Sequence, residues 1–552
     1  MKKLAILLLF LMIIPGIALG DDYVRFDELN VTGTPKMIFR ADRADLTANP
    51  ALLGSDAKYG FILDTYYLGS TTKVSSDYLN YLVRGADTGY TTGYSDGTYV
   101  SNGFGTDMGY VMRLNDASTL GFVFNYEFSY LEGNENFFDY WNNDPRGPVH
   151  GFFAGDVERK VKENAFSLAM LYNLAISDTF SFGTGVEYRY THEKISDDLD
   201  GFGRRLDGLA TPETAYIDRN TVFDIHLMRP VVGVSMQPSD AFSLNASTSV
   251  GFYWGAIDRR AIYSDTRIPA GGGVPNSETL ESRDYFGWDI EASVNPIITV
   301  SDALSFPISL EFYYGSFDYG IDGVTEGYFA PLNMRTVSRG PGSIDYDVEE
   351  DIWRIVAGLG VVYTMDSYTF DGTLSYTYAD WDNSYEQTNI VSGPGPANLN
   401  GRSFFGQDDS LTVNMLSLDL GMSTEFSESL SASFGVRYDM GWAKKEYTDT
   451  YDSPMISPLG NNLQIISAED SDLFQNLTLD MAVLYEPMDG LTLSLSSMIT
   501  MPLDGVDYDM DGSAVANMGV PVLGYALVDP TVRNLSLETW DYGCMFNVMY
   551  EF

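Results

Sequence analysis

The most constraining feature of the sequence is a short acidic turn that recurs at a nearly constant interval. The seven copies are NDA (115–117), SDT (177–179), SDA (239–241), SDA (301–303), MDS (365–367), SES (427–429) and MDG (488–490). Their central acids are 62, 62, 62, 64, 62 and 61 residues apart. The side chain of Asp in a tight turn can bond its own backbone, and small neighbours tolerate the bend. The spacing therefore predicts one hairpin in every unit of about 62 residues.

The segments on both sides of each turn alternate between two kinds of residue. FSLAMLYNLAI (166–176) precedes one turn and FSLNASTSVGFYW (242–254) follows the next. In FSFGTGVEYRY (180–190), one face carries Phe, Thr, Val and Tyr, whereas the other carries Ser, Gly, Gly, Glu and Arg. Strict alternation over such lengths is typical of β-strands. We interpret the apolar face as lipid-facing and the small, charged face as the lining of a lumen.

The strand count predicts a closed barrel. One strand near 58–72, seven hairpins and a last strand near 537–552 make sixteen, with fourteen as the alternative if one pairing is a loop hairpin. The connections between hairpins are long, for example 196–220 and 392–410, so we expect loops of about 20–30 residues. Short periplasmic turns and long extracellular loops are the layout of a transmembrane, antiparallel, all-β outer-membrane barrel. A closed sheet also satisfies every backbone group in lipid.

The N-terminus has the composition of a secretory signal peptide. Two lysines precede an apolar run, and small residues stand at 18 and 20, so residues 1–20 are expected to be removed before Asp21. We expect the mature chain to lie in the bacterial outer membrane, with membrane lipid and lipopolysaccharide as its surroundings.

The C-terminus predicts a barrel-assembly signal. The last residues, WDYGCMFNVMYEF, alternate apolar side chains up to Tyr550 and Phe552. An amphipathic final strand that ends in Phe is what outer-membrane barrels present to their assembly machinery, which is therefore an expected partner.

A segment ahead of the first strand, ADRADLTANPALLG (41–54), does not alternate. An Asp followed at short distance by Asn-Pro-Ala-Leu resembles the outer-membrane long-chain fatty-acid transporter family (FadL type), and so do YVMRLNDASTLGFVFNYEF and SLAMLYNLAISDTFSFGTGVEYRY. The resemblance implies that residues 21–56 form a hatch or plug inside a barrel of residues 57–552. It also implies passive uptake of hydrophobic small molecules, fatty-acid-like or aromatic. The expected plug residues are Asp45, Asn49, Pro50, Ala51 and Leu52.

The segment VFDIHLMRPVVGVSM (222–236) is predicted to be irregular. Before Arg229 and Pro230, the apolar side chains stand at the odd positions Phe223, Ile225 and Leu227. After these two residues, the apolar side chains of the same face stand at the even positions. Because Pro cannot donate to the ladder, we expect a bulge or a local opening there. These are two alternatives. A local opening would form a lateral gate in the wall, whereas a bulge would only adjust the curvature of the wall.

The formal net charge of −45 argues against nucleic acid as a partner, because both would be polyanions. Within DGVDYDMDGS (504–513), Asp507, Asp509 and Asp511 follow the beginning of a calcium loop. A calcium site and a merely acidic strand face both remain open. No other cofactor is expected.

Catalysis is not expected. The chain has three histidines, and only His226, beside Asp224 on the presumed lumen face, offers a candidate base. Two alternatives to hydrophobic uptake remain. The first is an open sixteen-stranded porin for small hydrophilic or cationic solutes, and the second is a surface-display or secretion-associated barrel.

Overall fold

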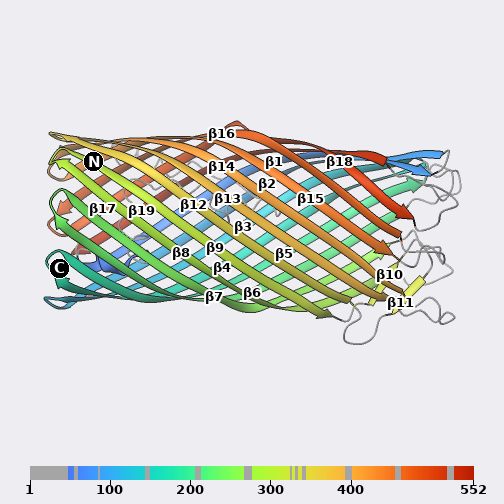
Figure 1. Ribbon diagram of the computed structural model, residues 1–552, viewed down its shortest axis with the longest axis horizontal. Coiled ribbons are helices and arrows are strands. Elements are labelled where there is room, and N and C mark those ends of the chain that lie inside the picture. The colour runs from blue at the N-terminus through green and yellow to red at the C-terminus, as the bar shows by residue number, and fades with distance from the viewer. Residues whose placement is uncertain are drawn as a thin grey trace.

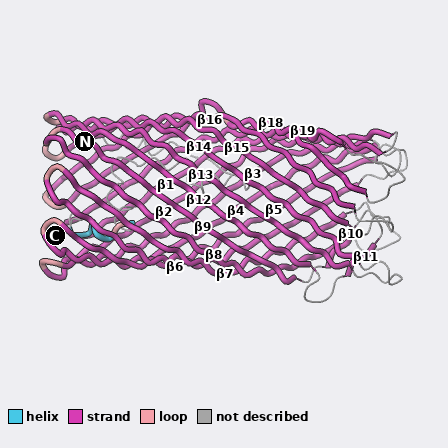
Figure 2. The backbone as a smooth tube through the Cα atoms, in the orientation of Figure 1, coloured by secondary structure: helices cyan, strands magenta, loops and turns pink. Residues whose placement is uncertain are grey.

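The protein is a single closed antiparallel β-barrel in the computed structural model (Figures 1 and 2). The structure describes residues 48–54, 60–84, 87–142, 150–205, 213–265, 276–323, 326–329, 334–337, 344–391, 401–453, 462–518 and 528–551. Closure comes from β1 (Gly60–Arg84), which pairs with both β2 (Asp87–Asn115) and β19 (Val528–Glu551). β17 (Leu491–Asp504) and β18 (Val506–Met518) both pair with β16 and β19, so they are two segments of one wall strand.

The barrel therefore has sixteen wall strands, because its sheet of 17 segments contains that one divided strand. Sixteen is the number predicted from the turns. The remaining wall strands are β3 (Ser118–Asn142), β4 (His150–Ser177), β5 (Phe180–Arg205), β6 (Glu213–Ser239), β7 (Phe242–Asp265), β8 (Asn276–Ser301), β9 (Leu304–Gly323), β12 (Ile344–Met365), β13 (Tyr368–Val391), β14 (Gly401–Ser427), β15 (Leu430–Ser453) and β16 (Asn462–Met488). A separate hairpin, β10 (Glu326–Phe329) with β11 (Met334–Val337), lies between β9 and β12, and a short 3-10 helix, η1 (Pro50–Gly54), precedes β1.

All seven acidic turns join consecutive strands at one end of the barrel, the left end in Figure 1. The bond that fixes several of them comes from the residue before the acid. The N–H of Ala117 donates to Asn115 Oδ1 at 2.9 Å, and the N–H of Thr179 donates to Ser177 Oγ at 3.3 Å. The positions of the turns are thus confirmed, whereas the predicted role of the central Asp side chain is replaced by that of its predecessor.

The strands are longer than a membrane requires. β9 has 20 residues and β2 has 29, whereas a tilted transmembrane strand needs about 9–11. The strands are therefore longer than a membrane crossing needs. The expected loops of 20–30 residues are wrong in length, because β5 and β6 run through most of 196–220 and β14 begins at Gly401.

The two faces of the wall differ as the alternation predicts. On β14, Leu416, Leu418 and Leu420 point outward and are exposed, whereas Met415 and Ser417 point inward and are buried. An exposed apolar face of this size is typical of a surface that contacts lipid or another protein. Among the described residues, no helix is long and apolar enough to cross a membrane.

The wall is regular at Arg229 and Pro230, so the predicted phase change is wrong. β6 pairs with β5 through both residues, and its pairing with β7 stops at Met228 and resumes at Val231 in the same register. Met228 and Val232 are exposed on the outside, whereas Leu227 and Val231 are buried on the inside. Pro230 removes ladder contacts on one side without inserting a residue, and therefore produces no bulge.

The irregular part of the wall lies in the last hairpin instead. Pairing between β17 and β19 stops at Thr500↔Asp541 and resumes on β18 at Val506↔Leu537. Residues 501–505 thus lie opposite 538–540, so the divided strand carries extra length at this point. Its pairing with β16 also shifts register beside Pro502. Extra residues in one strand of an antiparallel pair form a bulge.

Candidate functional site

The segment Asn49–Gly54 lies inside the barrel, against the inner face of β3–β6 near the acidic turns (Figure 2). Polar side chains of the wall hold it. Asn173 Nδ2 and Ser181 Oγ both donate to the carbonyl oxygen of Ala51, at 2.7 and 2.9 Å. Asn49 Nδ2 lies 3.3 Å from the carbonyl oxygens of both Val234 and Ala246, and its own Oδ1 accepts from the N–H of Ala51. These bonds fix the segment to wall strands β4–β7.

Glycines in the wall make room for this segment. A Cβ at Gly183 would lie 2.1 Å from Ala51 N and 2.2 Å from the carbonyl carbon of Pro50. A Cβ at Gly233 would lie 1.9 Å from Asn49 Oδ1. The small inner face of 180–190 is therefore the surface on which the segment rests.

Apolar packing completes the contact. Leu53 is fully buried, and Leu52 and Leu53 form one cluster with Val111, Ala169 and Leu171 of the wall. Of the expected plug residues, Asn49, Pro50, Ala51 and Leu52 come together at this place, and all are buried. Asp45 lies outside the described residues.

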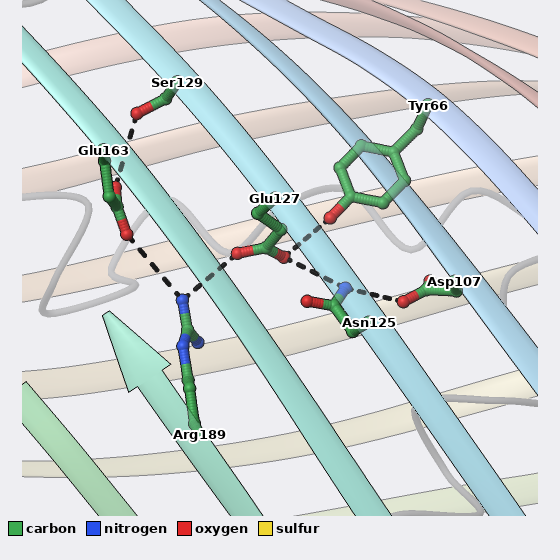
Figure 3. A network of polar contacts seen from close by, with 7 residues as sticks. All are labelled: Tyr66, Asp107, Asn125, Glu127, Ser129, Glu163 and Arg189. Carbon is green, nitrogen blue, oxygen red and sulfur yellow. Dashed lines mark hydrogen bonds and ion pairs between the residues drawn. The ribbon is translucent and has the colours of Figure 1, made fainter. Parts of the chain in front are cut away.

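A polar network lines the lumen on strands β1–β5 (Figure 3). Arg189 of β5 reaches Glu127 of β3 at 3.1 Å and Glu163 of β4 at 3.9 Å. Tyr66 of β1 donates to Glu127 at 2.6 Å, so one carboxylate ties three strands together. The same network includes Asn125, which donates to Asp107 at 2.6 Å, and Ser129, which donates to Glu163 at 3.3 Å.

A second network surrounds a carboxylate with no exposed surface, that of Asp289 on β8. Arg229 and Tyr253 each donate to Asp289 Oδ2 at 2.5 Å, and the N–H of Gly251 donates to Oδ1 at 2.9 Å. A buried charge is tolerated only when it is paired and hydrogen-bonded, as here. Arg229 is therefore a counter-ion inside the lumen, which the sequence did not predict.

The lumen also carries a continuous apolar cluster, named here the apolar belt. Phe317 of β9, Trp381 of β13 and Phe474 of β16 are among its bulky members. The rings lean along the wall, since a Cβ at Gly287 would meet the Phe317 ring and a Cβ at Gly441 would meet the Phe474 ring. The buried members of the belt are Val74, Tyr99, Leu131, Phe317, Ile352, Ala379, Trp381, Leu411, Val413, Met415, Ala443 and Phe474.

Partly buried side chains extend the belt around the lumen. Val161 of β4, Tyr253 of β7, Tyr285 of β8 and Tyr313 of β9 pack against it. Sequence reasoning missed the belt, because its members come from many strands and each contributes only one to three residues.

The other predicted residues do not meet in a site. The backbone of Asp507, Asp509 and Asp511 lies on β18, opposite Ser536, Asn534 and Val532 of β19. Within the described part of the chain, no three His, Cys, Asp or Glu side chains are grouped as metal ligands.

Of the two residues of the predicted assembly signal, the structure describes only Tyr550. This residue is exposed on the outer face, opposite Phe61 of β1 and Leu491 of β17, and Phe552 lies outside the described residues.

His226 lies on the outer face, contrary to the prediction for the lumen. It stacks on Trp254 with ring centroids 5.5 Å apart, and its Nδ1 lies 2.8 Å from the hydroxyl of Tyr188. Asp224, also outward, accepts from Tyr190 and lies 2.8 Å from His192. The candidate base is therefore part of an aromatic group on the outside of the barrel.

Comparison with known proteins gives similarity at the level of structure. No family model matches the chain, and no curated protein matches its sequence. A Pseudomonas aeruginosa FadL homologue is similar in structure at 11% identity and a TM-score of 0.35, over 93% of this chain and 94% of that one. The Pseudomonas putida toluene transporter TodX is similar at 11% identity and a TM-score of 0.31, over 92% and 94%.

The solved structures that match therefore include members of the family that the sequence resembles. The chain is similar to FadL-type barrels. The ferric yersiniabactin uptake receptor FyuA of Yersinia pestis also matches, at 9% identity and a TM-score of 0.27, over 87% of this chain and 80% of that one.

Proposed function

We propose that the protein is an outer-membrane channel for passive uptake of hydrophobic small molecules. The observation that carries this proposal is the apolar belt, since a pore for hydrophilic solutes has a polar, water-filled interior. A lumen that presents Phe317, Trp381 and Phe474 offers an apolar molecule a place to leave water. The apolar outer face supports the membrane location, with lipid and lipopolysaccharide around it.

In this proposal the N-terminal segment regulates passage. Asn49–Gly54 is fixed to one side of the lumen wall by Asn173 and Ser181, and by the buried side chain of Leu53. Residues 21–56 would act as a plug that shifts when ligand enters. The bulge beside Pro502 offers a place where an apolar molecule could leave sideways into lipid, because ladder contacts to β19 are missing at 501–505 and those to β16 are missing at 505–510.

Single-channel conductance in planar bilayers tests the plug and separates uptake from porin function. The full mature chain is compared with one that lacks residues 21–56. We expect the mature chain to conduct weakly and the shortened chain to conduct strongly. Equal, strong conductance of both would refute the plug and favour the porin alternative.

A further inference from the structure

The lumen arginines are already neutralised by the wall itself. Between the acidic turns and the belt, the inward-facing basic side chains with described surroundings include Arg189, Arg229, Arg354 and Arg437. Arg189 lies against Glu127 and Glu163. Arg437 contacts Asp439 at 2.8 Å and Asp419 at 3.9 Å, and Ser417 accepts a further bond from it.

The other two arginines lie together on the wall formed by β6–β12. Arg229 is bound to the buried Asp289. Arg354 lies over the ring of Tyr313, with its guanidinium carbon 5.9 Å from the ring centroid. Glu291 stands opposite Tyr313 in the β8–β9 register and is within electrostatic range of both arginines.

Carboxylates outnumber these two arginines on the same wall. Among the described side chains of β6–β12, the inward-facing acids are Asp289 and Glu291 on β8, Glu311 on β9 and Glu350 on β12. Glu350 also accepts a hydrogen bond from the indole N–H of Trp381, so an acid lies directly beside the belt. Four carboxylates against two guanidiniums leave an excess of two negative charges among the described inward-facing side chains of this wall. We call it the acidic wall.

We propose that the channel discriminates by ligand charge: it admits hydrophobic molecules that are uncharged or positively charged and rejects hydrophobic anions such as carboxylates. This inference rests on the proposed uptake function. A ligand carboxylate would have to leave water and displace a wall carboxylate from its arginine, because an unpaired buried charge is costly. An ammonium group, in contrast, meets acids and the faces of Tyr313, Phe317 and Trp381, and aromatic faces attract cations.

Binding of three matched probes to the purified mature protein in nonionic detergent tests this charge selection. The probes are 1-naphthylmethylamine, 1-naphthylmethanol and 1-naphthoate, which share one aromatic body and differ in charge at pH 7. Isothermal titration calorimetry gives each affinity. We expect the amine to bind at least as tightly as the alcohol, and naphthoate at least tenfold more weakly than the alcohol.

Two variants test whether the acidic wall causes the difference in affinity between the probes. Glu291→Gln and Glu311→Gln should each weaken the amine at least threefold and leave the alcohol unchanged. Asp382→Asn is the matched control, because Asp382 is exposed on the outer face of β13, and it should change none of the three affinities.

The possible outcomes separate this inference from the function on which it rests. Equal binding of all three probes, or tightest binding of naphthoate, would overturn the charge selection and leave hydrophobic uptake standing. Failure of the uncharged alcohol to bind would refute the proposed function itself, and with it the selection.

Discussion

Substitution of Gly183 by Ala should release the N-terminal segment from the wall. The new methyl group would lie 2.1 Å from Ala51 N and 2.2 Å from the carbonyl carbon of Pro50, whereas ordinary contacts begin near 3.4 Å. Both obstructing atoms belong to the backbone, so a side-chain rotation cannot relieve the clash. The segment must therefore move by more than about 1 Å, a shift comparable to those that break hydrogen bonds.

The cost of that movement follows from the interactions that it breaks. The bonds of Asn173 and Ser181 to the Ala51 carbonyl contribute about 1 kcal/mol each. Exposure of the fully buried Leu53 costs about 2 kcal/mol. The sum of about 4 kcal/mol corresponds to a change of about a thousandfold in the ratio of docked to released segment.

Maleimide labelling measures the release directly. Leu52→Cys, in a chain whose only cysteine has been removed by Cys544→Ser, reports access to the buried segment. Labelling should be slow with Gly183 and at least a hundredfold faster with Gly183→Ala. Gly103→Ala is the control, since its Cβ would find only ordinary contacts, the nearest at 3.6 Å. Slow labelling in the Gly183→Ala chain would refute the docked position of the segment.

Three further predictions concern stability, uptake and metal binding. Arg229→Ala leaves the buried Asp289 carboxylate without its counter-ion and should lower the free energy of unfolding by about 4 kcal/mol. Addition of Asp289→Asn should recover at least half of this loss, and denaturant unfolding followed by Trp fluorescence measures both changes. Trp381→Gln places a polar amide in the apolar belt and should reduce naphthalene uptake at least fivefold in whole cells, while heat-modified mobility on gels shows an unchanged amount of folded barrel. If Asp507, Asp509 and Asp511 hold calcium, millimolar Ca²⁺ should raise the thermal midpoint of the mature chain and not that of Asp509→Asn; an equal effect on both would leave only an acidic strand face.

The number and order of the wall strands could be predicted because turn chemistry is local. Each turn needs a small or polar residue such as Asn115 or Ser177 beside an acid, and seven such turns fix seven hairpins. Strand length could not be predicted as well, because polar residues in 196–220 suit a loop and a solvent-exposed barrel wall equally. The strands therefore run further than the composition suggests.

Alternation separates two faces of a strand without saying which one lies inside. In β6, Ile225 and Leu227 read as lipid-facing because they are apolar, yet they share the inner face with Arg229. The error arises because this lumen is itself partly apolar. The same ambiguity led to the prediction that His226 faces the lumen, whereas it stacks on Trp254 on the outer face of the barrel.

Interactions between distant parts of the chain left little trace in the sequence. Gly183 and Gly233 are the signal that could have located the docked segment, since two strands present glycine where the Pro50–Ala51 backbone and the Asn49 side chain approach. The pairing of Arg229 with Asp289 spans 60 residues and depends on the barrel register. The sequence of either strand alone does not predict this pair.

The central claim is that hydrophobic molecules cross the outer membrane through this lumen and hydrophilic ones do not. The most direct test is the initial uptake of radiolabelled naphthalene and of arabinose by cells that lack their own hydrophobic-uptake channel, with and without this protein in the outer membrane. The account predicts at least a fivefold gain for naphthalene and no gain for arabinose. A gain for arabinose with none for naphthalene would contradict it and identify a porin.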